Sequence, residues 1–189
     1  AYMTPSKLNE QASALFNEQL ENWELARKNF ANLSSVCTKK FFFEGFDVNV
    51  QFNPARIRSS AAKLDIKALR ERACFLCAEN LPKEQKNLNI GDYLLLVNPY
   101  PIFPEHFTIA RKEHVPQQIK PYFTDLLEFA EKLDNFIVFY NGPKCGASAP
   151  DHMHFQTGTK NFLPLIGDYK KLKPEWTVLL EKTDGAEIY

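Results

Sequence analysis

Hydrophobic positions follow the period of a helix in the first part of the chain. Apolar residues recur at helical spacing between residues 6 and 33, with charged and amide side chains between them: Leu8, Leu15, Leu20, Trp23, Phe30 and Leu33. An apolar stripe with this period is typical of an amphipathic helix that packs on one face. We therefore expect one helix over residues 6–33.

The following segment alternates with the period of a strand. Residues 40–44 and 46–52 flank Gly45, and apolar and polar positions alternate strictly in the second run. Two such runs around a glycine predict a β-hairpin.

The remaining pattern predicts more strands, a short helix around residues 66–72 and one longer helix. Residues 93–97 are a continuous apolar run, which favours a strand inside a sheet. Shorter runs predict strands at 106–111, 136–140, 152–156 and 176–180, and an apolar face predicts a helix over 116–133.

This order of elements predicts an α+β fold, with a mostly antiparallel sheet and flanking helices. We expect residues 1–64 to form an N-terminal extension of helix and hairpin, and residues 65–189 to form the main domain.

Charge and composition exclude several classes of protein. Lys and Arg total 23, as do Asp and Glu, so the formal net charge is zero and any phosphate site must be local. No run of 18 apolar residues occurs, and the first residues lack the pattern of a signal peptide. We expect a cytoplasmic protein that binds neither nucleic acid nor membrane.

The segment Asp151-His152-Met153-His154-Phe155-Gln156 concentrates the candidate chemistry. If it is a strand, His152, His154 and Gln156 share one face while Met153 and Phe155 anchor the other. A half-buried strand without function would show the same alternation, so the pattern alone leaves both interpretations open.

A loop rich in small residues precedes this segment, from Asn141 to Ser148. Small residues such as Gly146 let backbone N–H groups approach an anion closely, and Lys144 adds a positive charge. The loop therefore favours a phosphate site, although a plain connection would have the same composition.

Cys74 and Cys77 form a Cys-x-x-Cys pair, which indicates a metal site, a redox pair or two buried apolar side chains. Zinc takes four ligands from Cys and His. If His114 and His152 join the pair, the site is closed by protein ligands, and the zinc would be structural.

Three blocks of sequence resemble the histidine-triad superfamily, within it the branch of galactose-1-phosphate uridylyltransferases and dinucleoside polyphosphate phosphorylases. They are the Cys-x-x-Cys-x-x-Asn block at 74–80, the strand leading to a metal-binding histidine at 103–115, and the loop and His-x-His-x-Gln motif at 141–156. The final Gln, where hydrolases of the superfamily have a third histidine, is similar to the transferase and phosphorylase branch.

The resemblance implies a role for each matching residue. His154 would be the nucleophile and Gln156 would hold α-phosphate oxygens. Asn141, Gly146 and Ser148 would bind phosphate with Lys144, His106 would line the nucleotide site, and a structural zinc would be held by Cys74, Cys77, His114 and His152. Ser148 stands one residue farther from the histidines than in the common motif of the superfamily.

The implied function is a nucleotidyltransferase or phosphorylase that acts on a nucleotide sugar or a dinucleoside polyphosphate. A nucleotidyl-histidine would form and then react with a phosphate or sugar phosphate acceptor. Only one of the two related halves of a uridylyltransferase is visible, which predicts a part of a longer enzyme or a homodimer. Alternative functions are a dinucleoside polyphosphate hydrolase and a nucleotide-binding domain without turnover.

Overall fold

The computed structural model describes residues 5–54, 72–181 and 187–188. Contacts group the chain into two compact units, residues 1–36 with 53–160 and residues 37–52 with 161–189. All predicted site residues belong to the first unit. The expected domain boundary between residues 64 and 65 lies outside the described residues and stays a prediction. The same holds for the short helix expected around residues 66–72, of which only residue 72 is described.

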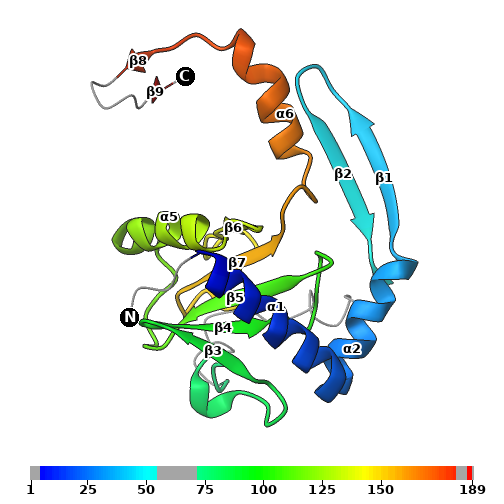
Figure 1. Cartoon of the computed structure of the whole chain (residues 1–189), viewed down its shortest axis with the longest axis vertical. Helices are drawn as coiled ribbons and strands as arrows, with labels where there is room; N and C mark the ends of the chain where they lie inside the picture. Colours follow the sequence, from blue (N-terminus) through cyan, green and yellow to red (C-terminus); the bar gives the residue numbers. More distant parts are fainter. Residues whose placement is uncertain (1–4, 55–71, 182–186, 189) are drawn as a thin grey trace. The chain divides into compact units, whose positions relative to one another are not determined.

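A five-stranded sheet forms the centre of the first unit, in the order β3-β4-β5-β7-β6 (Figure 1). Its strands are β3 (Asn87–Ile90), β4 (Tyr93–Val97), β5 (His106–Arg111), β6 (Phe136–Phe139) and β7 (His154–Thr159). All neighbours in this sheet are antiparallel. The α+β class and the antiparallel sheet are thereby confirmed.

Three details of the sheet differ from the expectation. β3 was not predicted, because its four residues alternate with asparagine and give a weak apolar signal. β6 ends one residue early, at Phe139. β7 begins at His154, not at residue 152, and extends to Thr159. His152 lies in the bend before the strand.

The helix expected over 6–33 is wrong as a single element. α1 (Pro5–Asn22) and α2 (Glu24–Ala31) are separated at Trp23, whose backbone is extended with φ −124° and ψ 99°. The indole of Trp23 is buried, and the break lets α2 pack Phe30 into the same core as α1. A short 3₁₀ turn, Asn32–Ser35, ends the pair.

The helix expected over 116–133 is wrong in its first part. Residues 116–119 are not helical, and a 3₁₀ turn, Lys120–Tyr122, leads into α5 (Phe123–Lys132), which ends one residue before the expected end. Proline is excluded from a helix interior and disfavours helical backbone at the residue before it, which explains why Pro116 and Pro121 delay the start.

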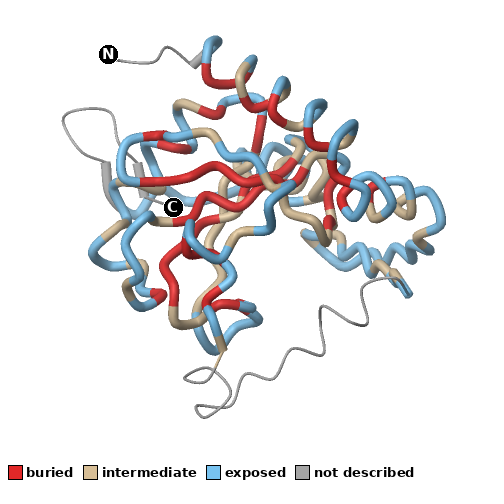
Figure 2. The backbone as a smooth tube through the Cα atoms, turned by 90° about the horizontal axis from the view of Figure 1, so that it is seen from below, coloured by how far each residue is buried: buried red, intermediate tan, exposed pale blue. Residues whose placement is uncertain are grey.

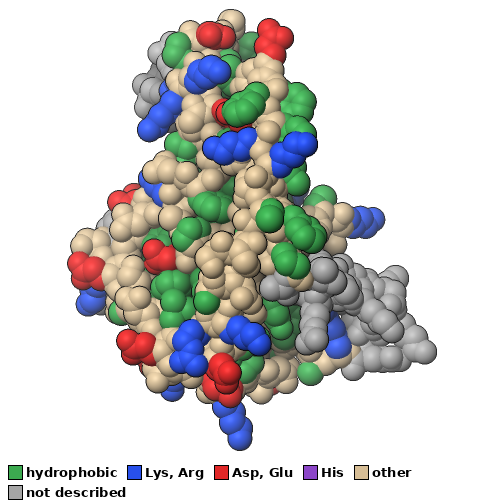
Figure 3. All heavy atoms as spheres, turned by 90° about the vertical axis from the view of Figure 1, so that its right-hand side faces the viewer, with side chains coloured by type: hydrophobic (Ala, Val, Ile, Leu, Met, Phe, Trp, Pro, Cys, Tyr) green, Lys and Arg blue, Asp and Glu red, His purple; other side chains and the backbone are tan. Residues whose placement is uncertain are grey.

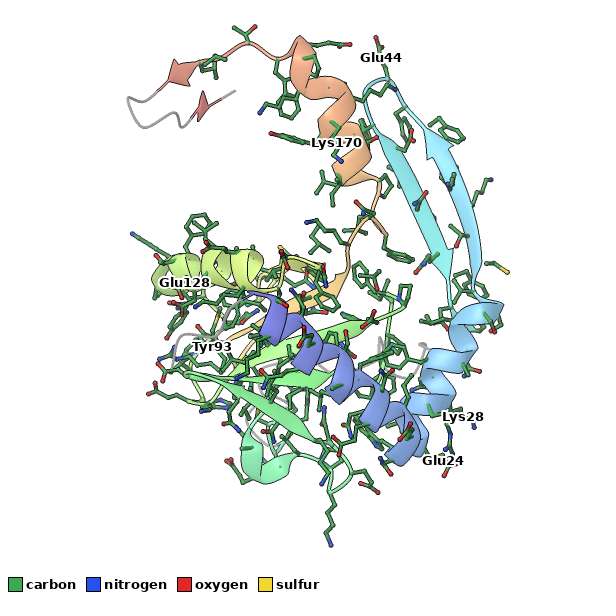
Figure 4. The ribbon with its side chains drawn as sticks, in the orientation of Figure 1. Glu24, Lys28, Glu44, Tyr93, Glu128 and Lys170 are labelled. Atoms are coloured by element: carbon green, nitrogen blue, oxygen red, sulfur yellow. The ribbon has the colours of Figure 1, made fainter. Side chains whose placement is uncertain are left out.

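One face of the sheet packs against α1, α2 and α5 to form the main core. Buried positions run through the strands and along the inner side of the helices in Figure 2. α5 contributes Phe129, whose ring meets Tyr93 edge-on at 5.0 Å between centroids, while Glu128 on its outer side pairs with Lys132 (Figure 4). A smaller cluster on the other face contains Cys74, Leu76, Cys77, Leu94, Leu96, Ala110 and Ala149.

The second unit contains the predicted hairpin, β1 (Cys37–Phe42) and β2 (Asp47–Phe52), whose strands pair antiparallel. β1 begins three residues earlier and ends two residues earlier than the expected run 40–44, and β2 begins one residue later than expected. It also contains α6 (Leu165–Leu172), a 3₁₀ turn at Lys173–Glu175, and the pair β8 (Leu180–Glu181) and β9 (Glu187–Ile188). The strand expected over 176–180 is wrong except at its last residue. Gly45 turns the hairpin with φ +88°, a backbone that favours glycine.

Many apolar side chains of this unit are exposed, including Phe42, Phe43, Phe52, Leu165 and Leu179. Hydrophobic side chains also lie at the surface between Lys and Arg on the face shown in Figure 3. Among the described residues, none of the helices has the length and apolar character needed to cross a bilayer.

Gly158 on β7 gives the sheet a testable packing constraint. A Cβ at this position would lie 2.4 Å from the ring of Phe103, which is itself buried. We predict that Gly158→Ala lowers the free energy of unfolding by about 1–3 kcal/mol, because the ring must move within a packed core. Urea denaturation followed by circular dichroism measures this change.

Gly142→Ala is the matched control, since its added Cβ would meet nothing closer than 3.7 Å. We expect a change of at most about 0.5 kcal/mol. Equal losses in the two variants would contradict the packing constraint.

Candidate active site

Pairing of β7 with β5 and β6 arranges the polar residues on the sheet. His154 lies opposite Ala110, and Gln156 lies between Thr108 on β5 and Phe139 on β6. Between them, Phe155 points into the main core. His154 and Gln156 therefore share the face of the smaller cluster, as the alternation of the motif predicted.

Hydrogen bonding fixes the state of the His154 ring. Its Nδ1 lies 2.8 Å from the carbonyl oxygen of His152, which can only accept a hydrogen bond. Nδ1 must therefore carry the proton, and Nε2 of the neutral ring keeps its lone pair. Burial lowers the pKa of His154, and the bond to the His152 carbonyl opposes this shift in part. Both effects leave a ring that favours the neutral form, with the proton on Nδ1 and the lone pair on Nε2.

Gln117 holds the backbone of His154 on the side where β6 has ended. The Gln117 Oε1 accepts from the His154 N–H at 2.8 Å, and its Nε2 donates to the His154 carbonyl at 2.9 Å. β6 pairs with β7 only as far as Gln156, so no strand lies beside His154 on that side. The Gln117 amide makes the hydrogen bonds that a neighbouring strand would otherwise make. The same Nε2 donates to the carbonyl of Asn141 at 2.9 Å, so one buried side chain ties His154 to the start of the loop.

The loop 141–150 carries the other predicted phosphate ligands. Lys144, Gly146 and Ser148 are exposed, and Gly146 has φ +91°, a conformation that favours glycine. Arg72 anchors the loop by donating to the Ser148 carbonyl at 3.1 Å and to the Asp151 carboxylate at 3.0 Å. The loop therefore presents Lys144, Gly146 and Ser148 at the surface, while the alternate residues Ala147 and Ala149 are buried.

His106 is buried and forms a hydrogen bond with Gln156. It begins β5, is 1% exposed, and places Nε2 2.9 Å from Gln156 Oε1. Its Nδ1 faces the backbone N–H of Ile102 at 3.2 Å. Both ring nitrogens are therefore hydrogen-bonded within the protein, and His106 contacts Gln156 from the buried side.

The four residues named as metal ligands lie together. Their ligand atoms are within 4.8 Å of one another, and Cys74, Cys77 and His152 are buried while His114 is exposed. His152 Nδ1 lies 3.3 Å from Cys74 Sγ and 3.2 Å from His114 Nδ1, and Cys77 Sγ lies 3.2 Å from His114 Nδ1. The cluster has the donor set of a closed four-coordinate site.

The chemistry of the cluster fits a cation. His152 Nε2 lies 2.7 Å from the Arg111 carbonyl and must donate to it, so its Nδ1 lone pair faces the two sulfur atoms. Burial, together with the neighbouring Cys74, raises the pKa of Cys77 to about 11. A bound cation reverses this preference, because it stabilises thiolate and accepts the imidazole lone pair. The cluster could therefore bind a metal ion.

Known proteins with similar sequences include galactose-1-phosphate uridylyltransferases. The chain is 33% identical over 106 residues to galactose-1-phosphate uridylyltransferase of Halalkalibacterium halodurans, covering 47% of this chain and 21% of the relative. It is 37% identical over 71 residues to the enzyme of the same name from Staphylococcus saprophyticus, covering 36% and 14%. The matches thus span about a fifth or less of these relatives' length.

A solved structure shares the fold. Yeast Ap4A phosphorylase Apa2 in complex with Ap4A aligns with a TM-score of 0.51 and 20% identity, covering 91% of this chain and 60% of that chain. The three blocks of sequence that resemble the histidine-triad superfamily thus find their likeness in galactose-1-phosphate uridylyltransferases, and the fold is shared with an Ap4A phosphorylase, as the resemblance predicted. A family model described as a domain of unknown function, DUF4922, matches residues 15–159, and the chain belongs to that family.

Two residues of the site had no usable sequence signal. Gln117 lies in a polar Pro-Gln-Gln segment that resembles the first turn of a helix, and Arg72 precedes the cysteine pair without any motif. Both act through backbone carbonyls far along the chain, which no spacing rule reveals.

Removing the Gln117 amide leaves three backbone groups without this partner, two on the buried His154 and one on the half-buried Asn141. We predict that Gln117→Met, which conserves the approximate volume, lowers the free energy of unfolding by at least about 3 kcal/mol. Chemical denaturation measures the loss. Gln118→Met is the matched control, because Gln118 is exposed and adjacent, and we expect a change within about 0.5 kcal/mol. An equally mild effect at position 117 would show that the three bonds contribute little.

Proposed function

We propose that this chain carries the nucleotidyl-transfer site of an enzyme that acts on a nucleotide sugar or a dinucleoside polyphosphate, with His154 as the nucleophile. The observation that supports this most directly is the bond from His154 Nδ1 to the His152 carbonyl. It fixes a neutral tautomer whose lone pair lies on Nε2, the atom that an in-line attack on phosphorus requires.

The reaction has two displacements. The Nε2 lone pair bonds to the α-phosphorus, and the bond from phosphorus to the leaving phosphate oxygen breaks with its electrons on that oxygen. The nucleotidyl-imidazolium keeps its Nδ1 proton, and the His152 carbonyl stabilises the new positive charge. A phosphate or sugar phosphate oxygen then attacks phosphorus, the N–P bond breaks, and the neutral imidazole returns.

Gln156 and the loop 141–150 complete the proposed site. The amide of Gln156 shares the face of His154 and suits the equatorial oxygens of the phosphorus under attack, where a lost donor typically costs about a hundredfold in rate. Asn141, Lys144, Gly146 and Ser148 lie on the loop that Gln117 joins to His154, and we assign them to the remaining phosphate oxygens.

We further propose that Cys74, Cys77, His114 and His152 hold a structural zinc, which supplies a cross-link between the cysteine block and the segment before β7. Because His152 also accepts from His154 through its carbonyl, the same residue joins the two sites. The curated relatives are longer, and we propose that a second copy or a further part of a longer cytoplasmic protein completes the substrate pocket.

We predict that wild-type protein forms a covalent adduct on His154 when it is incubated with UDP-glucose or Ap4A. Intact-protein mass spectrometry should show the mass of one nucleoside monophosphate group, and acid should release it, as expected of an N–P bond. His154→Ala should form no adduct while keeping the circular dichroism spectrum of the wild type.

The outcome with acceptor separates the alternatives. Transfer requires that phosphate or a sugar phosphate discharges the adduct, whereas rapid loss in water alone would indicate a hydrolase. Nucleotide binding without any adduct would indicate a domain without turnover. Full transfer by His154→Ala would remove this residue from the mechanism.

The zinc proposal has its own test. We predict about one zinc per chain by inductively coupled plasma mass spectrometry, and less than half of that in Cys74→Ser and Cys77→Ser, since a lost thiolate opens the tetrahedral set. Cys37→Ser and Cys145→Ser are matched controls, because both cysteines are exposed and lie outside the cluster. Unchanged zinc in the Cys74 and Cys77 variants, or no zinc in carefully prepared wild type, would reject the site.

A further inference from the structure

The hydrogen bonds around His106 determine the protonation of its ring. The backbone N–H of Ile102 can only donate, so His106 Nδ1, 3.2 Å away, must offer its lone pair. A protonated ring would turn two donors toward each other. The neutral ring therefore carries its proton on Nε2, the opposite tautomer to that of His154.

This tautomer determines the orientation of the Gln156 amide. His106 Nε2 lies 2.9 Å from Gln156 and carries a hydrogen, so the atom that it meets must be the carbonyl oxygen Oε1. Two hydrogen bonds, from the Ile102 N–H to His106 and from His106 to Gln156, determine the orientation of the amide. The assignment therefore does not depend on distinguishing nitrogen from oxygen in the amide itself. The NH₂ group of Gln156 is left at the other end of the amide.

Packing prevents the imidazole of His106 from leaving this position. It is 1% exposed, and its ring lies 5.2 Å from that of Phe103 and 6.4 Å from that of Phe139, measured between centroids. Gly158, the residue opposite His106 on β7, leaves the space that Phe103 fills. Gln156 itself is only half-buried, so part of this residue remains accessible beside the buried His106.

We propose that His106 is a positioning residue that holds the Gln156 amide with its NH₂ turned toward the substrate, so that position 156 serves only as a hydrogen-bond donor to a phosphoryl anion. This inference rests on the proposed function of His154. Without His106, the amide could turn by half a rotation and place its carbonyl oxygen against the anion.

The fixed orientation has a chemical consequence for the class of substrate. Gln156 stabilises phosphoryl oxygens but gives no proton to a leaving group, because an amide is a very weak acid. The site therefore suits leaving groups that depart as anions, such as the phosphate of a phosphoanhydride. An amine, the leaving group of a phosphoramidate, departs only after protonation.

The tautomers are tested directly on the wild-type chain by nuclear magnetic resonance. Protein carrying ¹⁵N in its histidine rings should show Nε2–H for His106 and Nδ1–H for His154, assigned with the variants His106→Phe and His154→Ala. This measurement needs no turnover, so it stands even if the proposed function fails. An Nδ1–H tautomer, or a charged ring, at His106 near neutral pH would overturn the proposal.

A double-mutant cycle tests whether His106 acts through Gln156. The readout is the dissociation constant for UMP and AMP by calorimetry, together with the rate of adduct formation. The substitution His106→Phe places an aromatic ring beside Phe103 and Phe139. As a single substitution, we expect it to weaken binding about ten- to hundredfold relative to the wild type, the cost of a lost hydrogen bond to a charged group. In the Gln156→Ala background the same substitution should change binding less than about twofold.

Equal effects in the two backgrounds would show a merely structural role for His106 and overturn the proposal. The Gln156→Glu variant is a second test. In this variant His106 still donates to one carboxylate oxygen, while the other carboxylate oxygen faces the phosphoryl anion. The variant should bind UMP and AMP more weakly than Gln156→Ala, and retention of wild-type affinity would also overturn the proposal. A failure of the proposed function alone would instead appear as intact binding and tautomers without any adduct.

Discussion

The register between β5 and β7 is the constraint on which the site depends. It places Ala110 opposite His154, Thr108 opposite Gln156 and His106 opposite Gly158, so one ladder of hydrogen bonds sets the spacing of all the polar groups. A shift by one residue would turn Phe155 and Met153 to the polar face and bury the histidine and glutamine in the main core. The burial of Phe155 against Tyr93 and Phe129 therefore specifies the chemistry as well as the stability of the sheet.

Two kinds of linkage join the elements of the site. Side chains that bond to backbone, Gln117 and Arg72, hold the loop and the first residue of β7 from outside the sheet. The cluster of Cys74, Cys77, His114 and His152 holds the cysteine block against the same segment. His152 belongs to both systems, because its ring faces the sulfur atoms while its carbonyl accepts from His154. A disturbance of the cluster is thus expected to change the orientation of the His154 imidazole as well as local stability.

Sequence patterns predicted the elements whose burial has a simple period. The strands at 93–97 and 106–111 were found because runs of apolar residues report burial directly. The hairpin was found from alternation around Gly45, although its strands are largely exposed. The helix boundaries failed where tertiary packing decides the backbone, as at Trp23, whose indole is buried by a break that local propensity does not encode. The cysteine pair and the polar row could be singled out from residue types and spacing, while the choice of His114 and His152 as further metal ligands relied on the family resemblance. The roles of Gln117 and Arg72 could not be predicted, because they depend on which carbonyl lies beside them after folding.

Gly158 also limits which chemistries this sheet can host. The polar row runs from His154 to Gln156, and the next position on the same face is filled by the ring of Phe103. Even a methyl group has no room there, so the row cannot be lengthened by a further functional side chain. Within this scaffold, a change of reaction type is therefore expected to require substitution of Gln156 itself or of His106, its buried hydrogen-bond partner.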